Sequence, residues 1–467
     1  MIFSIRKLFR HNRSHQRLQR DRIGRLLFEL RIFFKRLIAR VFTVGDRMTA
    51  RVRGFTLIEL LVSMLIATVI ISTLLAFTVN IMETDRREQA KVESQSDIQA
   101  ALNYISDDLQ EAVYIYNADS LNTVSAVGNT NTTSGIKDQL PQVTDNSIFA
   151  NSTPVLVFWK RKYYNPTDTV NVGGGVTKQV GCLAYGTSTT STGCYDANGN
   201  PIGSGQYAYS LVAYYLIYDN ASGANPTWSN AARLGRWELN DGIRSTCQAD
   251  YITTPTACSD PKPIARVDFT PPGAIAGSSM VNYWTAPDQG FTPFSSQGGT
   301  VDSLMNQWTK APAGYLATNT PTVLMDFLDD SPYSTDQDDG IPSNAPVGNA
   351  PVDIPIRANV AGTPSTNPDC YIENVGTGGA SSSASQRIPA TFSTASSNPA
   401  QNISSFYVCV NSSQNVARIY LRGNALARLR LNQTVSQRLS SVSSSTLSSF
   451  FSTGNIRAYG NGRVYTQ

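Results

Sequence analysis

A single acidic residue stands at the edge of a long uncharged segment. Residues 53–59 read Arg-Gly-Phe-Thr-Leu-Ile-Glu, and no charged side chain occurs in the 23 residues from Leu60 to Met82. As a helix, this segment would rise about 35 Å, which is enough to cross a hydrocarbon core of roughly 30 Å. A carboxylate such as that of Glu59 is costly beside lipid unless it has a partner, so this junction constrains the fold more than any other feature.

The flanks of the uncharged segment predict its orientation. Arg51 and Arg53 lie immediately before it. Because positively charged flanks stay in the cytoplasm, we expect a single-pass protein of the inner membrane, with the N-terminus inside and the later residues in the periplasm. The segment is too long for a secretory signal peptide, and no small-residue cleavage site follows it. An ordinary signal anchor would need neither the glycine nor the glutamate.

The junction closely resembles the signal of type IV prepilins, in which a short basic leader precedes Gly, Phe-Thr-Leu-Ile-Glu and an apolar helix. The matching positions here include Gly54, Phe55 and Glu59. The resemblance implies that prepilin peptidase cleaves after Gly54 and that the new amine of Phe55 is methylated. It also implies that Glu59 pairs with the N-terminal amine of a neighbouring subunit. The implied partners are other pilin or pseudopilin subunits and an inner-membrane assembly platform.

The basic character of the chain belongs to residues 1–54. They hold 15 Lys and Arg against three acidic residues, a net charge of +12. Since the whole chain carries +4, residues 55–467 carry a net charge of −8. The composition therefore gives no support for a nucleic-acid partner of the part that follows the leader.

The length of this leader leaves two interpretations open. Met48 would begin a leader of Met-Thr-Ala-Arg-Val-Arg-Gly, which has the length usual for prepilins, so residues 1–47 would then not be translated. Alternatively, residues 1–47 are a cytoplasmic extension. Apolar residues between Ile23 and Val41 fall at helical spacing among arginines, which is typical of a helix that lies on a membrane surface.

A long helix is predicted to continue from the apolar segment. Apolar side chains recur every three or four residues from Ile98 to Tyr116, and no Pro or Gly occurs from Phe55 to Tyr116. We therefore expect one helix over 55–116. Its first half, 55–82, would be the membrane part, and an amphipathic second half, 83–118, would pack on a head domain.

The remaining residues, 119–467, predict a β-rich, loop-heavy head outside the membrane, and thus an α+β fold. Asn461-Gly462 is a strong hairpin turn signal between Ile456–Tyr459 and Arg463–Thr466. Tracts rich in Gly, Ser, Thr, Asn and Pro, including 435–454, predict exposed loops. One large domain and two modules both remain open, with a candidate boundary near 330–352. The other expected strands are Val155–Trp159, Tyr207–Tyr218, Arg233–Leu239, and the hairpin Phe406–Val410 with Val416–Arg422.

All six cysteines follow the apolar segment. An even number of cysteines in an exported domain favours disulfides over free thiols. Of the 15 connectivities that six cysteines allow, we predict pairing of neighbours in the sequence. A zinc site is disfavoured, because no Cys-x-x-Cys occurs and no His is available to help. The expected pairs are Cys182–Cys194, Cys247–Cys258 and Cys370–Cys409.

Catalytic motifs are mostly missing from the chain. Its two histidines, His11 and His15, both precede Gly54, so Ser-His-Asp and Cys-His catalysis and His-based metal sites are excluded after the leader. The Gly-rich run that begins at Gly173 lacks the spacing and the ending of a phosphate loop. We expect no enzyme.

One acidic cluster, from Asp326 to Asp339, is the remaining candidate site. Asp336, Asp338 and Asp339 precede a glycine and offer the oxygen ligands that calcium prefers, but the EF-hand spacing and its closing Glu are missing. We favour a solvated loop over a calcium site, and we expect no other cofactor. Paired carboxylates for glycoside chemistry are a weaker alternative.

Aromatic residues of the head offer a candidate sugar-stacking face. The residues that could form it are Tyr214, Tyr215, Tyr218 and the nearby Trp237. Core packing is the favoured interpretation, because buried sheets use the same residues.

Two further resemblances concern the head. Ser210–Tyr218 and Ala232–Leu239 resemble minor pseudopilins of the J-type and PilW-like groups. Ala417–Arg428, with Val323–Phe327, is similar to the hormogonium polysaccharide secretion pseudopilins of filamentous cyanobacteria, particularly the HpsC group. These imply a minor pseudopilin that supports polysaccharide export and gliding motility, with the exported polysaccharide as a further partner and a cell-surface filament as its destination. A minor subunit of an ordinary type IV pilus or of type II secretion, a carbohydrate-binding tip adhesin and a tethered surface enzyme remain alternatives.

Overall fold

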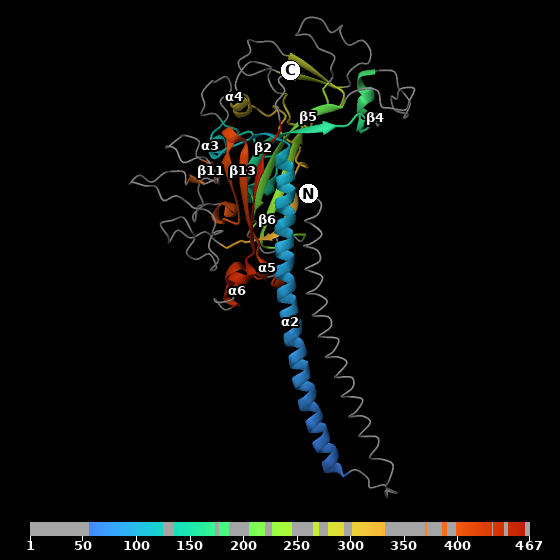
Figure 1. The fold of residues 1–467 in the computed structure, drawn as a ribbon, viewed down its shortest axis with the longest axis vertical. Coiled ribbons are helices and arrows are strands. Elements are labelled where there is room, and N and C mark those ends of the chain that lie inside the picture. Colours follow the sequence, from blue (N-terminus) through green and yellow to red (C-terminus); the bar gives the residue numbers. More distant parts are fainter. Residues whose placement is uncertain are drawn as a thin grey trace, which may run out of the picture. The chain divides into compact units, whose positions relative to one another are not determined.

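The structure is a computed structural model, and it forms two compact units, Met1–Ile81 and Met82–Gln467. Helix α2 (Leu57–Gln110) begins in the first unit and ends in the second (Figure 1). The structure describes residues 56–124, 135–172, 177–185, 205–219, 227–244, 265–269, 279–293, 301–331, 369–370, 385–389, 398–431, 433–442 and 447–462.

Helix α2 confirms the long helix that the sequence predicts, but it ends at Gln110 rather than at Tyr116. Residues Ala112–Ile115 form strand β1 instead, which pairs antiparallel with β2. The phenol of Tyr116 explains the difference, because it accepts a hydrogen bond from Trp159 Nε1 at 2.8 Å and donates one to the carbonyl of Met305 at 2.7 Å. A helix over these residues would lose the strand ladder and both of these buried contacts.

The first sheet has five antiparallel strands in the order β1-β2-β5-β6-β9. Three of its strands coincide with the apolar runs predicted as strands, which confirms those predictions, although β5 ends one residue before the predicted end at Tyr218. Both faces of its central strand are buried, which explains why that strand reads as a continuous apolar run in the sequence. The strands after β1 are β2 (Ser152–Tyr164), β5 (Gln206–Ile217), β6 (Ala232–Asn240) and β9 (Thr322–Leu328).

The second sheet also has five antiparallel strands, in the order β10-β11-β12-β13-β14. The predicted hairpin before Arg422 is confirmed as β12 and β13, whose turn places Asn415 in the left-handed conformation, with a φ of 50°. The predicted hairpin at Asn461-Gly462 stays a prediction, because residues 463–467 lie outside the described part. The strands are β10 (Asp369–Cys370), β11 (Ser385–Ile388), β12 (Phe406–Asn411), β13 (Val416–Arg422) and β14 (Thr453–Tyr459).

Smaller elements surround the two sheets. Two short hairpins are β3 (Thr169–Asn171) with β4 (Thr177–Gln179) and β7 (Ala265–Phe269) with β8 (Ser279–Tyr283). The short helices are α3 (Ala118–Asn122), α4 (Val301–Asn306), α5 (Ala425–Leu429) and α6 (Val435–Ser440). The 3-10 helices are η1 (Ser147–Asn151), η2 (Val180–Tyr185), η3 (Pro399–Asn402), η4 (Ser412–Gln414) and η5 (Ser448–Phe450).

One hydrophobic core joins the C-terminal part of α2 to both sheets. In Figure 1 this part of the helix runs beside β6. Against the second sheet the contact is close at Gly454 of β14, where an added Cβ would come within 2.6 Å of Ile98 and 2.8 Å of Leu102. The side chains of α2 that are buried are Ala90, Ser94, Ile98, Ala101, Leu102, Ile105, Asp108 and Leu109.

The tract 435–454 is not the exposed loop that its composition predicts. It contains α6 and η5, and the side chains of Leu447, Phe450 and Phe451 are buried in a cluster with Ala90 of α2. Lys91 of α2 also lies 4.6 Å above the ring of Phe450. The prediction from composition failed because three large apolar residues among the serines pack on α2.

Part of the acidic cluster is likewise buried rather than solvated. The side chains of Asp329 and Asp330 are fully buried, each in an ion pair, Asp329 with Arg422 at 2.5 Å and Asp330 with Arg438. The amide of Asn424 also donates to Asp330 Oδ1 at 3.2 Å. These pairs join the end of β9 to β13 and α6, so the expectation of a solvated loop is wrong for these two residues.

The stability of the head should fall as pH rises from about 4 to 6. Burial raises the pKa of Asp330 to about 6, with Asp329 adding to the effect and Arg438 opposing it. Since a carboxyl group in the unfolded chain titrates near 3.9, the folded head binds more protons in this window, and the loss should be about 3 kcal/mol. Thermal unfolding of the full-length protein in detergent, compared with Asp330→Asn, tests this. Equal pH slopes for the two proteins would contradict it.

Candidate functional site

The first turn of α2 carries Glu59, the charged residue that directly precedes the uncharged segment. The hydroxyl of Thr56 accepts a hydrogen bond from the backbone N–H of Glu59 at 3.3 Å, and the carbonyl of Thr56 accepts one from Leu60 at 3.2 Å. Thr56 therefore caps the helix, and Glu59 stands at the third helical position, where a carboxylate interacts favourably with the helix dipole. Gly54 and Phe55 lie outside the described residues.

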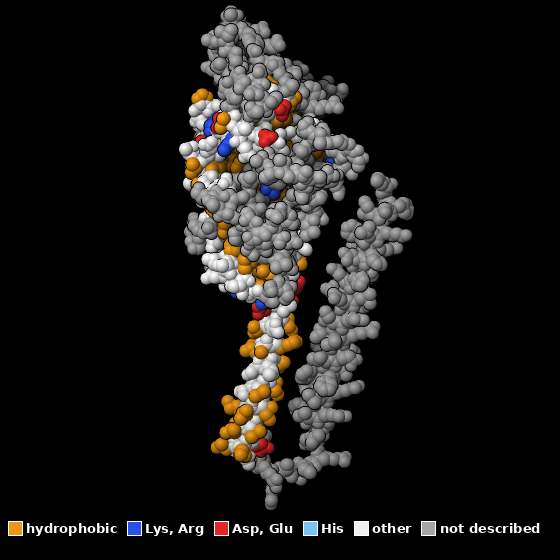
Figure 2. Space-filling view, turned by 90° about the vertical axis from the view of Figure 1, so that its left-hand side faces the viewer, with side chains coloured by type: hydrophobic (Ala, Val, Ile, Leu, Met, Phe, Trp, Pro, Cys, Tyr) orange, Lys and Arg blue, Asp and Glu red, His pale blue; other side chains and the backbone are white. Residues whose placement is uncertain are grey.

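The apolar part of α2 offers side chains suited to lipid or to other helices. Every side chain from Leu57 to Met82 is exposed, and Figure 2 shows hydrophobic groups along the face in view. Within the described part of the chain, α2 is the one helix that is long and apolar enough to cross a membrane. This part of the helix is thus compatible with membrane anchoring.

The hydroxyl groups within this apolar part are satisfied inside the helix. Each of five Ser and Thr hydroxyls donates to a backbone carbonyl three or four residues earlier, at 2.7–3.1 Å. A hydroxyl without a hydrogen-bond partner would be costly in a hydrocarbon environment. These bonds remove that cost, so the Ser and Thr residues are compatible with a membrane-spanning helix. The hydroxyl groups belong to Ser63, Thr68, Ser72, Thr73 and Thr78.

Glu59 has no cation near it on its own helix. From residue 56 to residue 82 the sequence contains no Lys, Arg or His, and the next basic residue on α2 is Arg86. A counter-charge for the carboxylate beside lipid would therefore have to come from outside residues 56–82.

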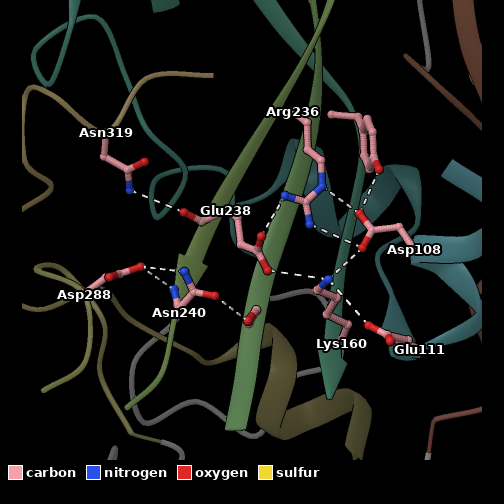
Figure 3. Close-up of polar contacts among 10 residues, drawn as sticks. Asp108, Glu111, Lys160, Arg236, Glu238, Asn240, Asp288 and Asn319 are labelled. Carbon is pink, nitrogen blue, oxygen red and sulfur yellow. Dashed lines mark hydrogen bonds and ion pairs between the residues drawn. The ribbon is translucent and has the colours of Figure 1, made fainter. Parts of the chain in front are cut away.

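A buried charge cluster holds the other end of α2 on the first sheet (Figure 3). Lys160 Nζ lies 2.7 Å from Asp108 Oδ1, and Arg236 Nε lies 2.8 Å from Asp108 Oδ2. The hydroxyl of Tyr214 donates to the same Oδ2 at 2.7 Å. These three partners come from β2, β6 and β5, so one carboxylate of the helix contacts three adjacent strands.

The carboxylate of Asp108 is held in its ionised form. Burial acts to raise its pKa, but the hydrogen bonds and charges of Arg236 and Lys160 outweigh burial and lower the pKa below its ordinary value. Conversely, burial acts to lower the pKa of Lys160, and the charge of Asp108 raises it. Glu238 completes the cluster with a 2.7 Å contact to Arg236, and the more exposed Glu111 lies 3.5 Å from Lys160.

Sequence reasoning missed this cluster, although two signals were present. Asp108 falls on the apolar stripe of the helix, three residues after Ile105 and directly before Leu109. Lys160 directly follows the apolar run Val155–Trp159, in the middle of β2. A charged residue on a buried stripe requires a partner, so each of these positions calls for an opposite charge.

The structure confirms core packing for one candidate site, and another candidate site lies outside the described residues. The candidate sugar-stacking face is buried core, since Tyr214, Tyr215 and Trp237 are at most 1% exposed and Tyr218 is 7% exposed. The candidate calcium ligands Asp336, Asp338 and Asp339 lie outside the described residues. Among the residues described, no group of three or more His, Cys, Asp and Glu side chains is placed to hold a metal ion.

The cysteine predictions remain open. Cys409 is buried on β12 and is disulfide-bonded. Cys370 lies on β10 of the same sheet, with β11 between the two strands. The side chains of the other five cysteines lie outside the described residues, so all three expected pairings, among them those of Cys182 with Cys194 and Cys247 with Cys258, stay predictions.

Comparison with known proteins adds one match, which falls on the N-terminal segment. Residues 49–75 match the family described as the prokaryotic N-terminal methylation motif. No curated protein and no solved structure matches the chain. The matched range includes Gly54, Phe55 and Glu59, and it continues into the apolar part of α2. The motif therefore supports a type IV pilin-like protein, and it implies processing by prepilin peptidase and assembly with other pilins.

Proposed function

We propose that the protein is a minor pseudopilin, a low-copy subunit of a filament related to type IV pili and type II secretion systems. The observation that carries this proposal is the methylation motif at residues 49–75, placed at the start of a helix whose later turns are built into a large head. The unit that contains the head comprises 386 residues, Met82–Gln467. A head of this size suits a subunit present in few copies more than a repeating one.

The proposed mechanism is mechanical rather than catalytic. Prepilin peptidase cleaves after Gly54, and the amine of Phe55 is methylated. The apolar part of α2 anchors the subunit in the inner membrane before assembly, with the N-terminus in the cytoplasm and the head in the periplasm. When the assembly platform moves the subunit into the filament, Glu59 pairs with the N-terminal amine of a neighbour and sets the register between helices. The satisfied hydroxyls of this helix support burial among other helices.

A link between head and helix is needed for this role. The cluster around Asp108 ties α2 to three strands, and Gly454 allows β14 to approach the same helix closely. Displacement of the helix would therefore carry the head with it. We further propose that the filament supports polysaccharide export and gliding motility. In this role the head would contact the exported polysaccharide.

Cells that lack prepilin peptidase provide the test. There, the protein should keep residues N-terminal to Phe55 and be missing from the filament fraction, while it remains in the membrane fraction. In cells with the enzyme, it should be processed and recovered with other pilin-like subunits. Recovery of the unprocessed protein in filaments at the normal level would overturn the proposed function.

A further inference from the structure

The antiparallel pair of strands β2 and β5 extends beyond the buried part of the first sheet. Trp159 and Leu211 are fully buried where these two strands cross the core. Further along the same face, Tyr163 of β2 is 45% exposed and Tyr207 of β5 is 49% exposed. Two large aromatic side chains are therefore presented to solvent at the far end of strands that are otherwise core.

The two tyrosines form one surface together with an arginine. Tyr163 is the direct cross-strand partner of Tyr207, and their ring centroids lie 4.8 Å apart. The guanidinium carbon of Arg161 lies 4.0 Å from the centroid of the Tyr207 ring. We call Arg161, Tyr163 and Tyr207 the tyrosine platform. The cation lies against one ring and leaves aromatic surface of both rings open to a ligand.

Gly205 makes this arrangement sterically feasible. It directly precedes β5, and an added Cβ would come within 2.3 Å of the hydroxyl oxygen and 2.4 Å of the ring of Tyr163. Any other residue at this position would have to move the tyrosine away from its place beside Tyr207. The backbone thus accommodates the ring of Tyr163 where a side chain would displace it.

The charge of the platform comes from Arg161. Side chains alternate between the two faces of a strand, so Arg161 and Tyr163 share one face of β2, and Lys160 and Lys162 lie on the other. Lys160 is paired there with Asp108, and Lys162 lies 4.9 Å above the ring of Tyr164. An anionic group on the platform face would therefore be attracted by the guanidinium of Arg161, in a chain whose residues 55–467 carry a net charge of −8.

We propose that the tyrosine platform binds a segment of acidic polysaccharide, one whose sugar rings carry carboxylates. The apolar face of a sugar ring would stack on the exposed tyrosines, and the carboxylate would pair with the guanidinium of Arg161. This inference rests on the proposed function, which brings the head into contact with an exported polysaccharide. Nucleic acid fits less well, because its binding depends on neutralising many phosphates and the net charge is opposed to it.

Binding of defined polymers to the full-length protein in detergent tests the proposal. Polygalacturonate is the acidic probe, dextran the neutral one and a single-stranded oligothymidylate the nucleic-acid one. Polygalacturonate should bind at moderate salt and weaken as salt increases, since the contact is partly ionic. Tyr207→Ala and Tyr163→Ala should each weaken its binding about tenfold, and Arg161→Gln should remove most of its preference over dextran.

Tyr459→Ala is the matched control. Tyr459 of β14 is 48% exposed and lies under Arg457, at 4.8 Å, but its cross-strand partner is the buried Val416 rather than a second exposed tyrosine. This variant should bind polygalacturonate as the wild type does. An equal loss in the control, equal binding of dextran, tighter binding of the oligothymidylate or no binding of polygalacturonate would each overturn the proposal.

The same variants separate this inference from the proposed function. Tyr207→Ala and Tyr163→Ala should be processed at Phe55 and recovered in filaments at the wild-type level, because both side chains lie far along the sequence from the methylation motif. A wild-type protein that assembles but binds no acidic polymer would overturn the platform alone. A wild-type protein that binds the polymer but never enters a filament would overturn the proposed function and leave the platform in place.

Discussion

Replacing Glu59 by alanine should remove the protein from filaments and leave it in the membrane. The anchoring segment is unchanged, and the first turn of α2 only becomes more apolar. What is lost is the one charge between residues 56 and 82 that can pair with the amine of a neighbour. An amine left unpaired beside lipid costs up to several kcal/mol, so the filament fraction should contain at least tenfold less of the variant. Immunoblots of the sheared filament and membrane fractions give the ratio.

Glu83→Ala is the matched control for this substitution. Glu83 is also an exposed glutamate of α2, and its ion pair with Arg87 joins residues four apart on the helix surface. Such a pair contributes only a few tenths of a kcal/mol, so this variant should assemble normally. Wild-type levels of Glu59→Ala in the filaments would refute the proposed role of the carboxylate.

Replacing Asp108 by alanine should destabilise the head by about 3 kcal/mol, because Lys160 and Arg236 would lose one of the two carboxylates that they share and keep only Glu238 between them. At about 2 °C per kcal/mol for a large domain, the melting temperature should fall by about 6 °C. Tryptophan fluorescence of the full-length protein in detergent measures this. The pKa of Asp108 is lowered, so its contribution is complete above an ordinary aspartate pKa and is lost as pH falls below it.

The neighbouring aspartate separates this effect from a general loss of charge on the helix. Asp107 is exposed and accepts a hydrogen bond from Gln110 at 3.4 Å. Asp107→Ala should change the free energy of unfolding by no more than about 0.5 kcal/mol. If Asp108→Ala and Asp107→Ala melted at the same temperature, the ion pairs of Asp108 would not be what stabilises the contact between α2 and the first sheet.

The sequence predicts those parts of the fold that depend on local pattern. The uncharged run after Glu59 and the absence of Pro and Gly gave the long helix, and Val155–Trp159 gave the centre of β2. The end of the helix was wrong because Val113 and Tyr116 fit helical spacing and a strand equally well. Pairing with β2, which lies some forty residues later, decides between the two.

The remaining features depend on partners that are distant in the sequence. Asp330 is tolerated in the interior because Arg438 reaches it, and Asp329 because Arg422 does. No local pattern connects residues roughly a hundred positions apart. The tyrosine platform was missed for a related reason, since Tyr207 and Tyr214 look alike in a strand-like run until the length of the covered sheet is known.

The mature protein should begin at Phe55, the residue that supplies the assembly amine. Mass spectrometry of the N-terminal peptide, from protein isolated out of membranes and filaments, should show a peptide that starts at Phe55 and carries one methyl group on its amine, with Glu59 four residues later. A mature chain that starts at any other residue would refute assembly through the amine of Phe55.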